Sequence, residues 1–334
     1  MRYQTALSFA LFSFLSLQSV ALSAPATKAA TPSKAATVKS YVREYSFPTD
    51  YPIGALKLLG VERLGSENIG NGIGPAQGKL SINVPPDHTI MLDVNPHCLE
   101  HPERLKNVNI AGINRLKMSY LAMEDLDHSI CDKAMQTLPE CKDLVALHID
   151  RSDVTDKGLS SFKSLPSIKY LYASGANLDG SFLKEPQKLK SLEDLNLIFN
   201  PLKSANLKYL SALPHLAELV LNQSNLSDSD LSNLAKCTQI KRLYLLGNPK
   251  ITDKSLPLLR GLTNLEVLDV RGTSITFEGV LSLKTLKLKR LNITVRRYRP
   301  SELEQLTKAF PKAYLNYRGE GVGEENQVYF APLK

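Results

Sequence analysis

The sequence predicts an α/β solenoid, in which short parallel strands alternate with short helices, preceded by a small module of β-strands. The main observation is a triplet of leucine-like residues, spaced L-x-x-L-x-L, whose first members lie 24, 24, 24, 24, 25 and 23 residues apart. The second is the composition of the 334 residues, 43% apolar and 22% charged, which excludes collagen-like and wholly disordered chains.

The triplets define the repeat units, because a chance apolar periodicity would not keep this register through so many copies. A more degenerate triplet, Ile113/Leu116/Met118, lies 31 residues before the first clear one, so the first unit carries an insertion around 122–128. The clear triplets are Leu144/Leu147/Ile149, Ile168/Leu171/Ala173, Leu192/Leu195/Leu197, Leu216/Leu219/Leu221, Ile240/Leu243/Leu245, Leu265/Leu268/Val270 and Leu288/Leu291/Ile293.

Each unit is expected to hold one strand and one helix. The alternating L-x-L part of the triplet predicts a short strand with its leucines pointing inward. A few residues later a capping residue, such as Thr155, Ser227 or Thr252, precedes a short amphipathic stretch that predicts a helix. One such unit cannot bury its own apolar face, whereas stacked units can, with strands on a concave side and helices on a convex side.

This pattern resembles the leucine-rich-repeat family, in its helix-bearing types with units near 24 residues, and the resemblance implies a solenoid over 111–317. The asparagine that follows the strand in that family stands at Asn200 and Asn248. In other units Ser152, Asn177 or Thr273 lies near this place, which predicts looser turns there.

The ends of the stack need caps, because terminal repeats would otherwise expose leucines. At the C-terminal end we expect a helix from Ser301 and a closing strand over 313–317, before a tail at 318–334. At the other end, residues 41–110 are expected to form a small β cap module. This module is similar to the β segment that precedes the repeats in some bacterial exported leucine-rich-repeat proteins.

The cap module is predicted from short alternating segments. Strands at 80–84 and 90–94 flank a proline-containing turn, which predicts a hairpin, and 55–59 is a third strand candidate. The glycine-rich stretch at 70–74 lacks the context of a dinucleotide fingerprint and is expected to be a loop.

The N-terminal residues indicate export. One basic residue, an apolar run and the small residues before position 24 predict a signal peptide over 1–23, with an uncleaved anchor as the alternative. Residues 24–40, rich in Ala, Thr, Pro, Ser and Lys, predict a flexible linker. We therefore expect an exported protein, periplasmic or extracellular, with no membrane span after signal cleavage.

The four cysteines fall into two classes. Cys141 and Cys237 occupy the inward helix-end position of the repeat and are expected to be buried thiols. Cys98 and Cys131 do not, and in an oxidising compartment they predict a disulfide between the cap and the first repeat. The alternative joins them to His101 and His128 in a zinc site, because two Cys and two His suit tetrahedral zinc. The third possibility is that both cysteines are free thiols. No cofactor is expected.

The side chains beside the leucines of each strand would face the concave surface. Tyrosines and aliphatic residues among arginines and an aspartate have the composition of an interface, with Tyr172 and Tyr244 as anchors. Arg242, Arg271 and Arg290 would clamp anionic groups. The predicted binding residues are Tyr170, Tyr172, Asn196, Ile198, Val220, Arg242, Tyr244, Leu246, Asp269, Arg271 and Arg290.

A second surface signal is charge, since the chain carries a formal net charge of +8. A cluster of cations without an intervening acid predicts a basic end of the solenoid that could hold anionic groups. Besides Arg290, this patch comprises Lys284, Lys287, Lys289, Arg296, Arg297 and Arg299.

These patterns favour a non-catalytic binding protein that recognises a protein or an anionic polysaccharide or other envelope polymer on its concave face. No set of side chains in the sequence predicts a catalytic site. Nucleic acid is disfavoured, because no aromatic stacking platform accompanies the basic cluster. The alternatives are a structural cell-envelope component that acts through its linker and basic edge, and a metal-dependent enzyme that uses the cysteine and histidine group.

Overall fold

The computed structural model describes residues 40–60, 71–120, 130–294 and 299–316. The predicted signal peptide, nearly all of the linker and the C-terminal tail lie outside these ranges, as do His128, Arg296 and Arg297. Within the four described ranges, no helix combines the length and the apolar character that a membrane crossing needs.

The repeats form a parallel sheet whose strands follow the chain order, as the triplets predict. The middle leucines of neighbouring strands lie in register, so that Leu147 pairs with Leu171, and Leu171 with Leu195. The strands are β6 (Arg115–Lys117), β7 (Ala146–His148), β8 (Tyr170–Tyr172), β9 (Asp194–Asn196), β10 (Glu218–Val220), β11 (Arg242–Tyr244), β12 (Val267–Asp269), β13 (Arg290–Asn292) and β14 (Tyr314–Asn316).

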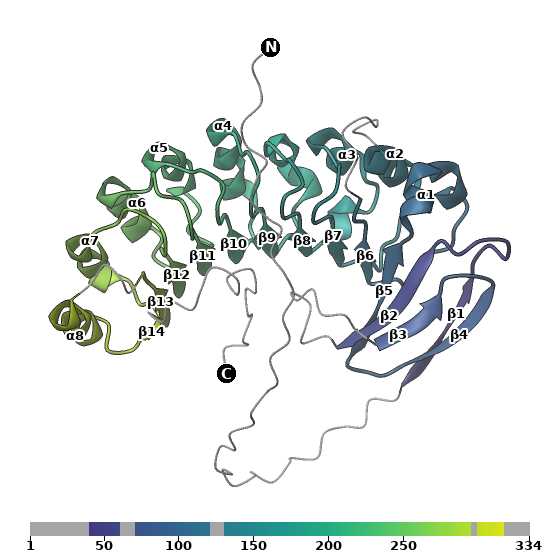
Figure 1. The fold of residues 1–334 in the computed structure, drawn as a ribbon, viewed down its shortest axis with the longest axis horizontal. Helices are drawn as coiled ribbons and strands as arrows, with labels where there is room; N and C mark the ends of the chain where they lie inside the picture. Colours follow the sequence, from purple (N-terminus) through teal and green to yellow (C-terminus); the bar gives the residue numbers. More distant parts are fainter. Residues whose placement is uncertain (1–39, 61–70, 121–129, 295–298, 317–334) are drawn as a thin grey trace, which may run out of the picture. The chain divides into compact units, whose positions relative to one another are not determined.

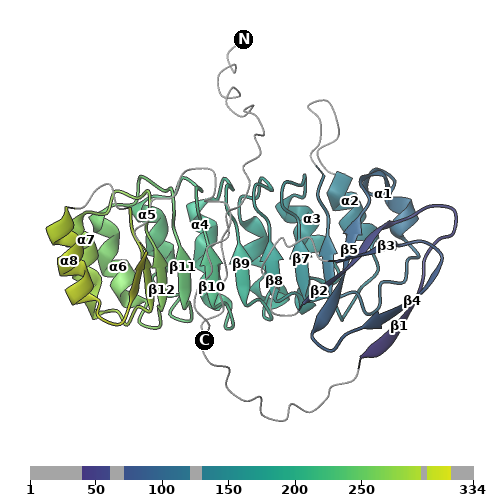
Figure 2. The same cartoon turned by 60° about the horizontal axis from the view of Figure 1, so that its bottom comes forward.

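The helices lie on the other side of the strands, along the outer side of an arc (Figure 1), and the turned view shows the units side by side in one row (Figure 2). The apolar side chains between the two layers make one continuous core that runs through the repeats, with the triplet leucines fully buried. The helices are α1 (Pro96–Glu100), α2 (Ile130–Thr137), α3 (Asp156–Ser161), α4 (Ser204–Leu207), α5 (Asp228–Leu231), α6 (Leu256–Gly261), α7 (Phe277–Ser282) and α8 (Pro300–Ala309).

Three of the five N-terminal strands that the structure describes join the same sheet, and the other two pair with each other in a separate two-stranded sheet, so the predicted hairpin is wrong. Strand β4 (Lys79–Val84) pairs antiparallel with β1 (Tyr41–Ser46) and not with β5 (His88–Val94). Strand β5 instead pairs antiparallel with β2 (Gly54–Gly60) on one side and parallel with β6 on the other. Because β5 belongs to both, the cap and the repeats share one twelve-stranded sheet.

The glycine-rich stretch predicted as a loop contains a strand. Strand β3 (Asn71–Pro75) pairs antiparallel with β2 and forms the outer edge of the twelve-stranded sheet. At Gly74 the backbone has φ +144°, a conformation that favours glycine. The glycines therefore shape an irregular edge strand rather than a nucleotide loop.

Candidate binding face

The geometry of the repeat strands defines one continuous surface. The middle residue of each strand points into the core, so the first and third residues point the opposite way. We call the surface made by these residues of β6 to β13, together with the residue two positions after each strand, the inner face. Equivalent side chains of adjacent strands lie side by side on it, at the strand spacing of about 4.8 Å.

The tyrosines and aliphatic residues predicted for this face lie on it, but they are buried. Tyr172 and Tyr244 keep only 5% and 8% of their surface exposed. Four of the side chains form an apolar cluster separate from the main core, because large side chains on the same face of adjacent strands pack laterally. The expectation that these side chains are exposed is therefore wrong for the anchors Tyr172 and Tyr244 and for Ile198, Val220 and Leu246, and Val267 beside them is buried as well.

The side chains that remain reachable on the inner face are polar. Of the predicted binding residues, the partly exposed ones are Tyr170, Asn196, Arg242, Arg271 and Arg290, whereas Asp269 is buried. A partner that contacts this face therefore meets hydroxyl, amide and guanidinium groups, with the aromatic and aliphatic side chains forming the floor between them.

Three charged residues at the same position of consecutive strands meet near the middle of this face. Glu218 lies between Asp194 on one side and Arg242 on the other. The Arg242 Nε donates a hydrogen bond to Glu218 Oε2, and its Nη2 lies 3.6 Å from Asp194 Oδ1. Burial raises the pKa of Asp194 to about 6, and burial together with the nearby Asp194 charge raises that of Glu218 to about 7.

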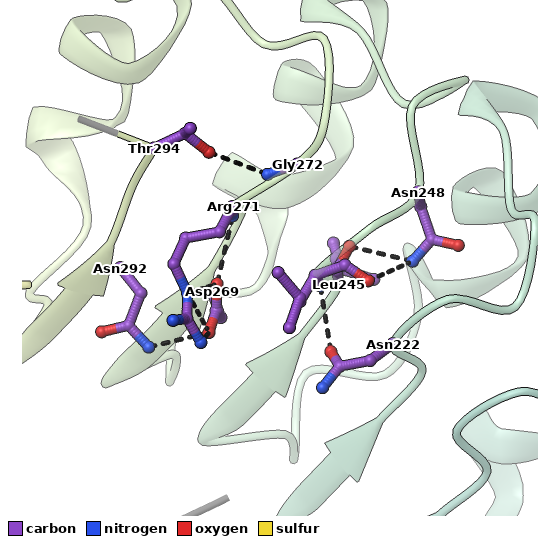
Figure 3. Close-up of polar contacts among 9 residues, drawn as sticks. Asn222, Leu245, Asn248, Asp269, Arg271, Gly272, Asn292 and Thr294 are labelled. Atoms are coloured by element: carbon purple, nitrogen blue, oxygen red, sulfur yellow. Dashed lines mark hydrogen bonds and ion pairs between the residues drawn. The ribbon is translucent and has the colours of Figure 1, made fainter. Parts of the chain in front are cut away.

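A second charged group lies on the next strand, β12, and just after it (Figure 3). The guanidinium of Arg271 donates to both carboxylate oxygens of Asp269, with the Nη2–Oδ2 distance at 2.7 Å. Asn292 donates a further hydrogen bond to Asp269 Oδ2 at 2.9 Å. Arg242 and Arg271 are thus both held by carboxylates of their own face, which reduces the positive charge that the predicted anion clamp could offer.

At the other end of the inner face, Arg115 and His148 are buried on the adjacent strands β6 and β7. Arg115, fully buried, donates from Nε to Thr89 Oγ1 at 3.0 Å and from Nη2 to the carbonyl of Gly60 at 3.3 Å. The ring of His148 stacks on that of Tyr172, with centroids 4.6 Å apart. Burial lowers the pKa of His148 to about 3, so the imidazole is neutral at neutral pH.

All four cysteines are buried free thiols, so the predicted Cys98–Cys131 disulfide is not formed. The two thiols point to different partners, since Cys98 Sγ lies 3.6 Å from the carbonyl of Pro52 and the Cys131 thiol interacts with Asp153, which together with burial raises its pKa. Cys141 and Cys237 are buried as predicted.

The zinc alternative cannot be assembled from the described residues. His128 lies outside them, and the ring of His101 packs edge-on against His97 with centroids 4.7 Å apart. Among the residues that the structure describes, no three His, Cys, Asp or Glu side chains are placed to hold one metal ion.

The predicted basic patch is only partly free of acids. Lys289 is paired with Glu266 at 2.9 Å, and Arg299 with Glu302 at 2.7 Å. Arg290 lies over the ring of Tyr314 on β14. Lys284 and Lys287 are exposed, and they make this end of the solenoid basic.

The similarity to known proteins is distant. No protein-family model matches the chain. Among solved structures, internalin C2 from Listeria monocytogenes is 20% identical over 61% of this chain and 80% of its own, with a TM-score of 0.43. The leucine-rich repeat-containing protein LegL7 from Legionella pneumophila is 16% identical over 71% of this chain and 93% of its own, with a TM-score of 0.40. TLR13, solved in complex with single-stranded RNA, is 17% identical over 68% of this chain and 30% of its own, with a TM-score of 0.45.

Sequence identities and TM-scores this low give no information about the activity or the ligand of this chain. Its architecture is established by its own geometry. The leucine triplets recur every two dozen residues, their strands pair in register, and a helical segment returns over the outer side of most units. The described part of the chain is a leucine-rich-repeat solenoid with a β cap at its N-terminal end.

Proposed function

We propose that this chain is a non-catalytic binding protein whose inner face recognises a protein partner. One observation carries the proposal. Among the described residues, buried side-chain polar atoms without a hydrogen-bond partner occur at six places, and four of these lie on the inner face, at His148, Tyr172, Glu218 and Asn292. Buried polar atoms are normally paired, because an unpaired one costs about 1–3 kcal/mol. Their concentration on one face supports a partner that supplies the missing hydrogen bonds.

Export is a further part of the proposal. The predicted signal peptide over 1–23 would direct the protein to the periplasm or to the outside of the cell. Sequencing the N-terminus of the protein recovered from its natural source tests this. A chain that still begins at Met1 would contradict cleavage and would favour the anchored alternative.

The binding face is tested by capture of partners from envelope extracts with the mature protein. We use a variant with two partly exposed inner-face changes, Tyr170→Ala and Arg290→Ala, and a matched variant with two exposed changes on the helical side, Lys163→Ala and Lys236→Ala. The proposal expects that only the first variant loses a captured protein. Equal capture by both variants and the wild type would place the binding site elsewhere.

The basic end offers a second candidate function. Exposed Lys284 and Lys287 favour contact with an anionic polysaccharide or another envelope polymer, so that the protein would act as a structural envelope component. Neutralising these lysines would then change retention in the envelope fraction, while the inner-face variant would behave as the wild type.

A further inference from the structure

Two carboxylates on the inner face share one guanidinium. Asp194, Glu218 and Arg242 stand at the same position of β9, β10 and β11, so their side chains are lateral neighbours. Arg242 is hydrogen-bonded to one oxygen of Glu218 and lies 3.6 Å from the nearer oxygen of Asp194, beyond hydrogen-bond distance. The other oxygen of Glu218 is buried and has no partner.

The charges around the two carboxylates do not balance. Arg242 is the cation that acts on both of them. The carboxylate of Glu193, beside Asp194, is paired with Lys169 at 2.9 Å and so adds no net charge. His148, the titratable group on the far side of Tyr172, is neutral at neutral pH. When both carboxyls are ionised the cluster therefore lacks one positive charge, and a buried charge without its counterpart is costly.

A neighbouring side chain gives a second and independent sign of a missing ligand. The Tyr172 hydroxyl is buried and has no hydrogen-bond partner, although the ring retains only 5% exposure. Burial, followed by the charges of Asp194 and Glu218, raises the pKa of Tyr172. Tyr172 stands on β8, the strand next to that of Asp194, so two carboxyls and an unpaired phenol hydroxyl lie in the same part of the inner face.

The cluster can be reached from solvent at its edge. The side chain of Asp194 is 16% exposed and that of Arg242 is 30% exposed, whereas Glu218 is 1% exposed. A cationic group that enters beside Arg242 meets Asp194 first, and the free oxygen of Glu218 is the deeper acceptor. A calcium ion would need six or more oxygen ligands, which two carboxylates, one already engaged by Arg242, do not supply.

We infer that Asp194, Glu218 and Tyr172 form the subsite for one lysine or arginine side chain of the protein partner. The inference rests on the proposed function and deepens it, because it gives the chemistry of the partner at this place. A guanidinium or ammonium group donates several hydrogen bonds and carries the one charge that the cluster lacks.

The subsite predicts that binding depends on pH. Burial raises the pKa values of Asp194 and Glu218 to about 6 and about 7, so the free protein carries a proton on this pair near pH 6.5. A bound cation favours the ionised carboxylates and expels that proton. Affinity should therefore rise as the pH increases from 5 to 8. The titratable and charged groups that face the pair are Tyr170 and Tyr172 on β8, Glu193 before β9, and Arg242 and Tyr244 on β11.

A hexalysine peptide with a fluorescent label is the probe, and hexaglutamate and dextran sulfate are the opposite-charge comparisons. Asp194→Asn and Glu218→Gln each remove one charge at nearly constant shape, and Glu266→Gln removes a partly exposed charge from a later unit as the matched control. At pH 8 we expect each inner-face variant to bind hexalysine about tenfold or more weakly, and the control to bind as the wild type. Asp194→Lys, which supplies a cation within the chain, should also abolish hexalysine binding.

Three results would overturn the subsite: hexalysine affinity that is unchanged in Asp194→Asn and Glu218→Gln, affinity that does not rise between pH 5 and pH 8, or preferential binding of dextran sulfate or hexaglutamate that depends on Arg242. Failure of the subsite is distinguishable from failure of the binding face. Suppose that the Tyr170→Ala, Arg290→Ala variant loses partner capture but Asp194→Asn binds hexalysine as the wild type does. The inner face would then be the binding face, and the subsite for a cationic side chain would be rejected.

Discussion

Asn248 shows how one side chain can organise a turn of the solenoid. It is fully buried, and its Oδ1 accepts hydrogen bonds from the backbone N–H groups of Ser224 and Leu226. Its Nδ2 donates to the carbonyls of Leu221 and Leu245, both at 2.9 Å. The amide thus satisfies backbone groups of two successive units and connects them.

Replacing Asn248 by alanine should lower the free energy of unfolding by about 2–4 kcal/mol, because several buried backbone groups lose their partner at once. The exposed Asn264, with a single hydrogen bond to the carbonyl of Thr238, is the control, and Asn264→Ala should cost less than about 1 kcal/mol. Urea unfolding measures both. Similar losses of unfolding free energy in the two variants would show that the buried Asn248 amide contributes no more to stability than an exposed one.

At Ser152 and Thr273, two of the places where looser turns were expected from the sequence, side-chain hydrogen bonds still hold the turn. Ser152 and Thr273 occupy the equivalent place, and each hydroxyl donates to the carbonyl three residues earlier, at 2.8 and 2.7 Å. The Ser152 hydroxyl also accepts from the N–H of Val154, so it satisfies two backbone groups where the Asn248 amide satisfies four. A sequence shows the substitution, but only the fold shows that a hydroxyl at this place still reaches the backbone.

A buried neutral histidine should make the protein sensitive to acid. The pKa of His148 is lowered to about 3, below the ordinary value of 6.5 that it regains on unfolding. Its contribution to stability is therefore fully present above pH 6.5 and is lost as the pH falls towards 3, because the unfolded chain binds the proton. The slope is about 1.4 kcal/mol per pH unit in this window.

His148→Phe keeps the ring that stacks on Tyr172 and removes the titration. We expect this variant to lose much less stability than the wild type between pH 6 and pH 4, as measured by chemical denaturation at each pH. His215→Phe changes an exposed histidine and should leave the wild-type slope unchanged. An unchanged slope in His148→Phe would mean that other groups cause the acid sensitivity.

At the scale of the elements, aspartates join the start of one helical segment to the start of the next. Asp253, in one unit, accepts hydrogen bonds from the backbone N–H and the hydroxyl of Thr276 in the following unit, at 2.8 and 2.6 Å. Thr276 in turn caps helix α7 by accepting from the N–H of Gly279. Asp132 and Thr155 repeat the arrangement at helix α3.

Close packing at these junctions makes one glycine necessary. A Cβ added to Gly279 would lie 2.1 Å from Asp253 Oδ1, so Gly279→Ala should displace the carboxylate and cost about 1–3 kcal/mol. Gly261 at the end of helix α6 has open space around it, and Gly261→Ala should be neutral or stabilise the protein by up to about 1 kcal/mol. Thermal unfolding compares the two.

The double variant Gly279→Ala, Asp253→Ala separates the cause from a general intolerance of the site. If the clash with the carboxylate is the reason, the loss on adding the methyl group should shrink once Asp253 is alanine. Purely additive losses would point instead to the backbone of helix α7.

The elements were predictable to different degrees. The leucine triplets predicted the repeat strands and their order, because each triplet buries the same residues against its neighbours. The alternation predicted the cap strands β2, β4 and β5, but not β1 or the glycine-rich β3. It also did not predict the partner of β4, since an alternating segment does not encode which strand it pairs with. The hydrogen bonds between aspartates and the following helix caps were not predicted, because Asp253 and Thr276 lie 23 residues apart in the sequence.

The position of the candidate site was predictable from the sequence, but the burial and the pairing of its side chains were not. Strand alternation placed the correct residues on the inner face, yet Tyr172 and Tyr244 are buried there, because lateral packing between strands covers most of their surface. The same packing brings Asp194, Glu218 and Arg242 together, which requires the register of three strands. The charged cluster therefore emerges only when the units are stacked.

At the scale of the whole molecule, the repeats contact mainly their neighbours, so stability should be local along the stack. Helix α8 closes the C-terminal end of the described repeats by burying Leu306 and Phe310. Behind it, β13 and β14 are held by hydrogen bonds such as that from Tyr314 N–H to the carbonyl of Lys289, at 2.8 Å. Loss of this cap should weaken the last strands first.

Leu306→Ala tests this locality. Removing a fully buried leucine side chain should cost about 2–5 kcal/mol in the units it covers. By hydrogen exchange, the amide protons of β13 and β14 should exchange at least tenfold faster, while those of β7 to β9 stay as protected as in the wild type. Leu219→Ala, in the middle of the stack, serves as the comparison and should speed exchange in units on both sides of β10. If Leu306→Ala instead accelerates exchange equally from β7 to β14, the repeats unfold together in one cooperative step. Stability would then not be local along the stack.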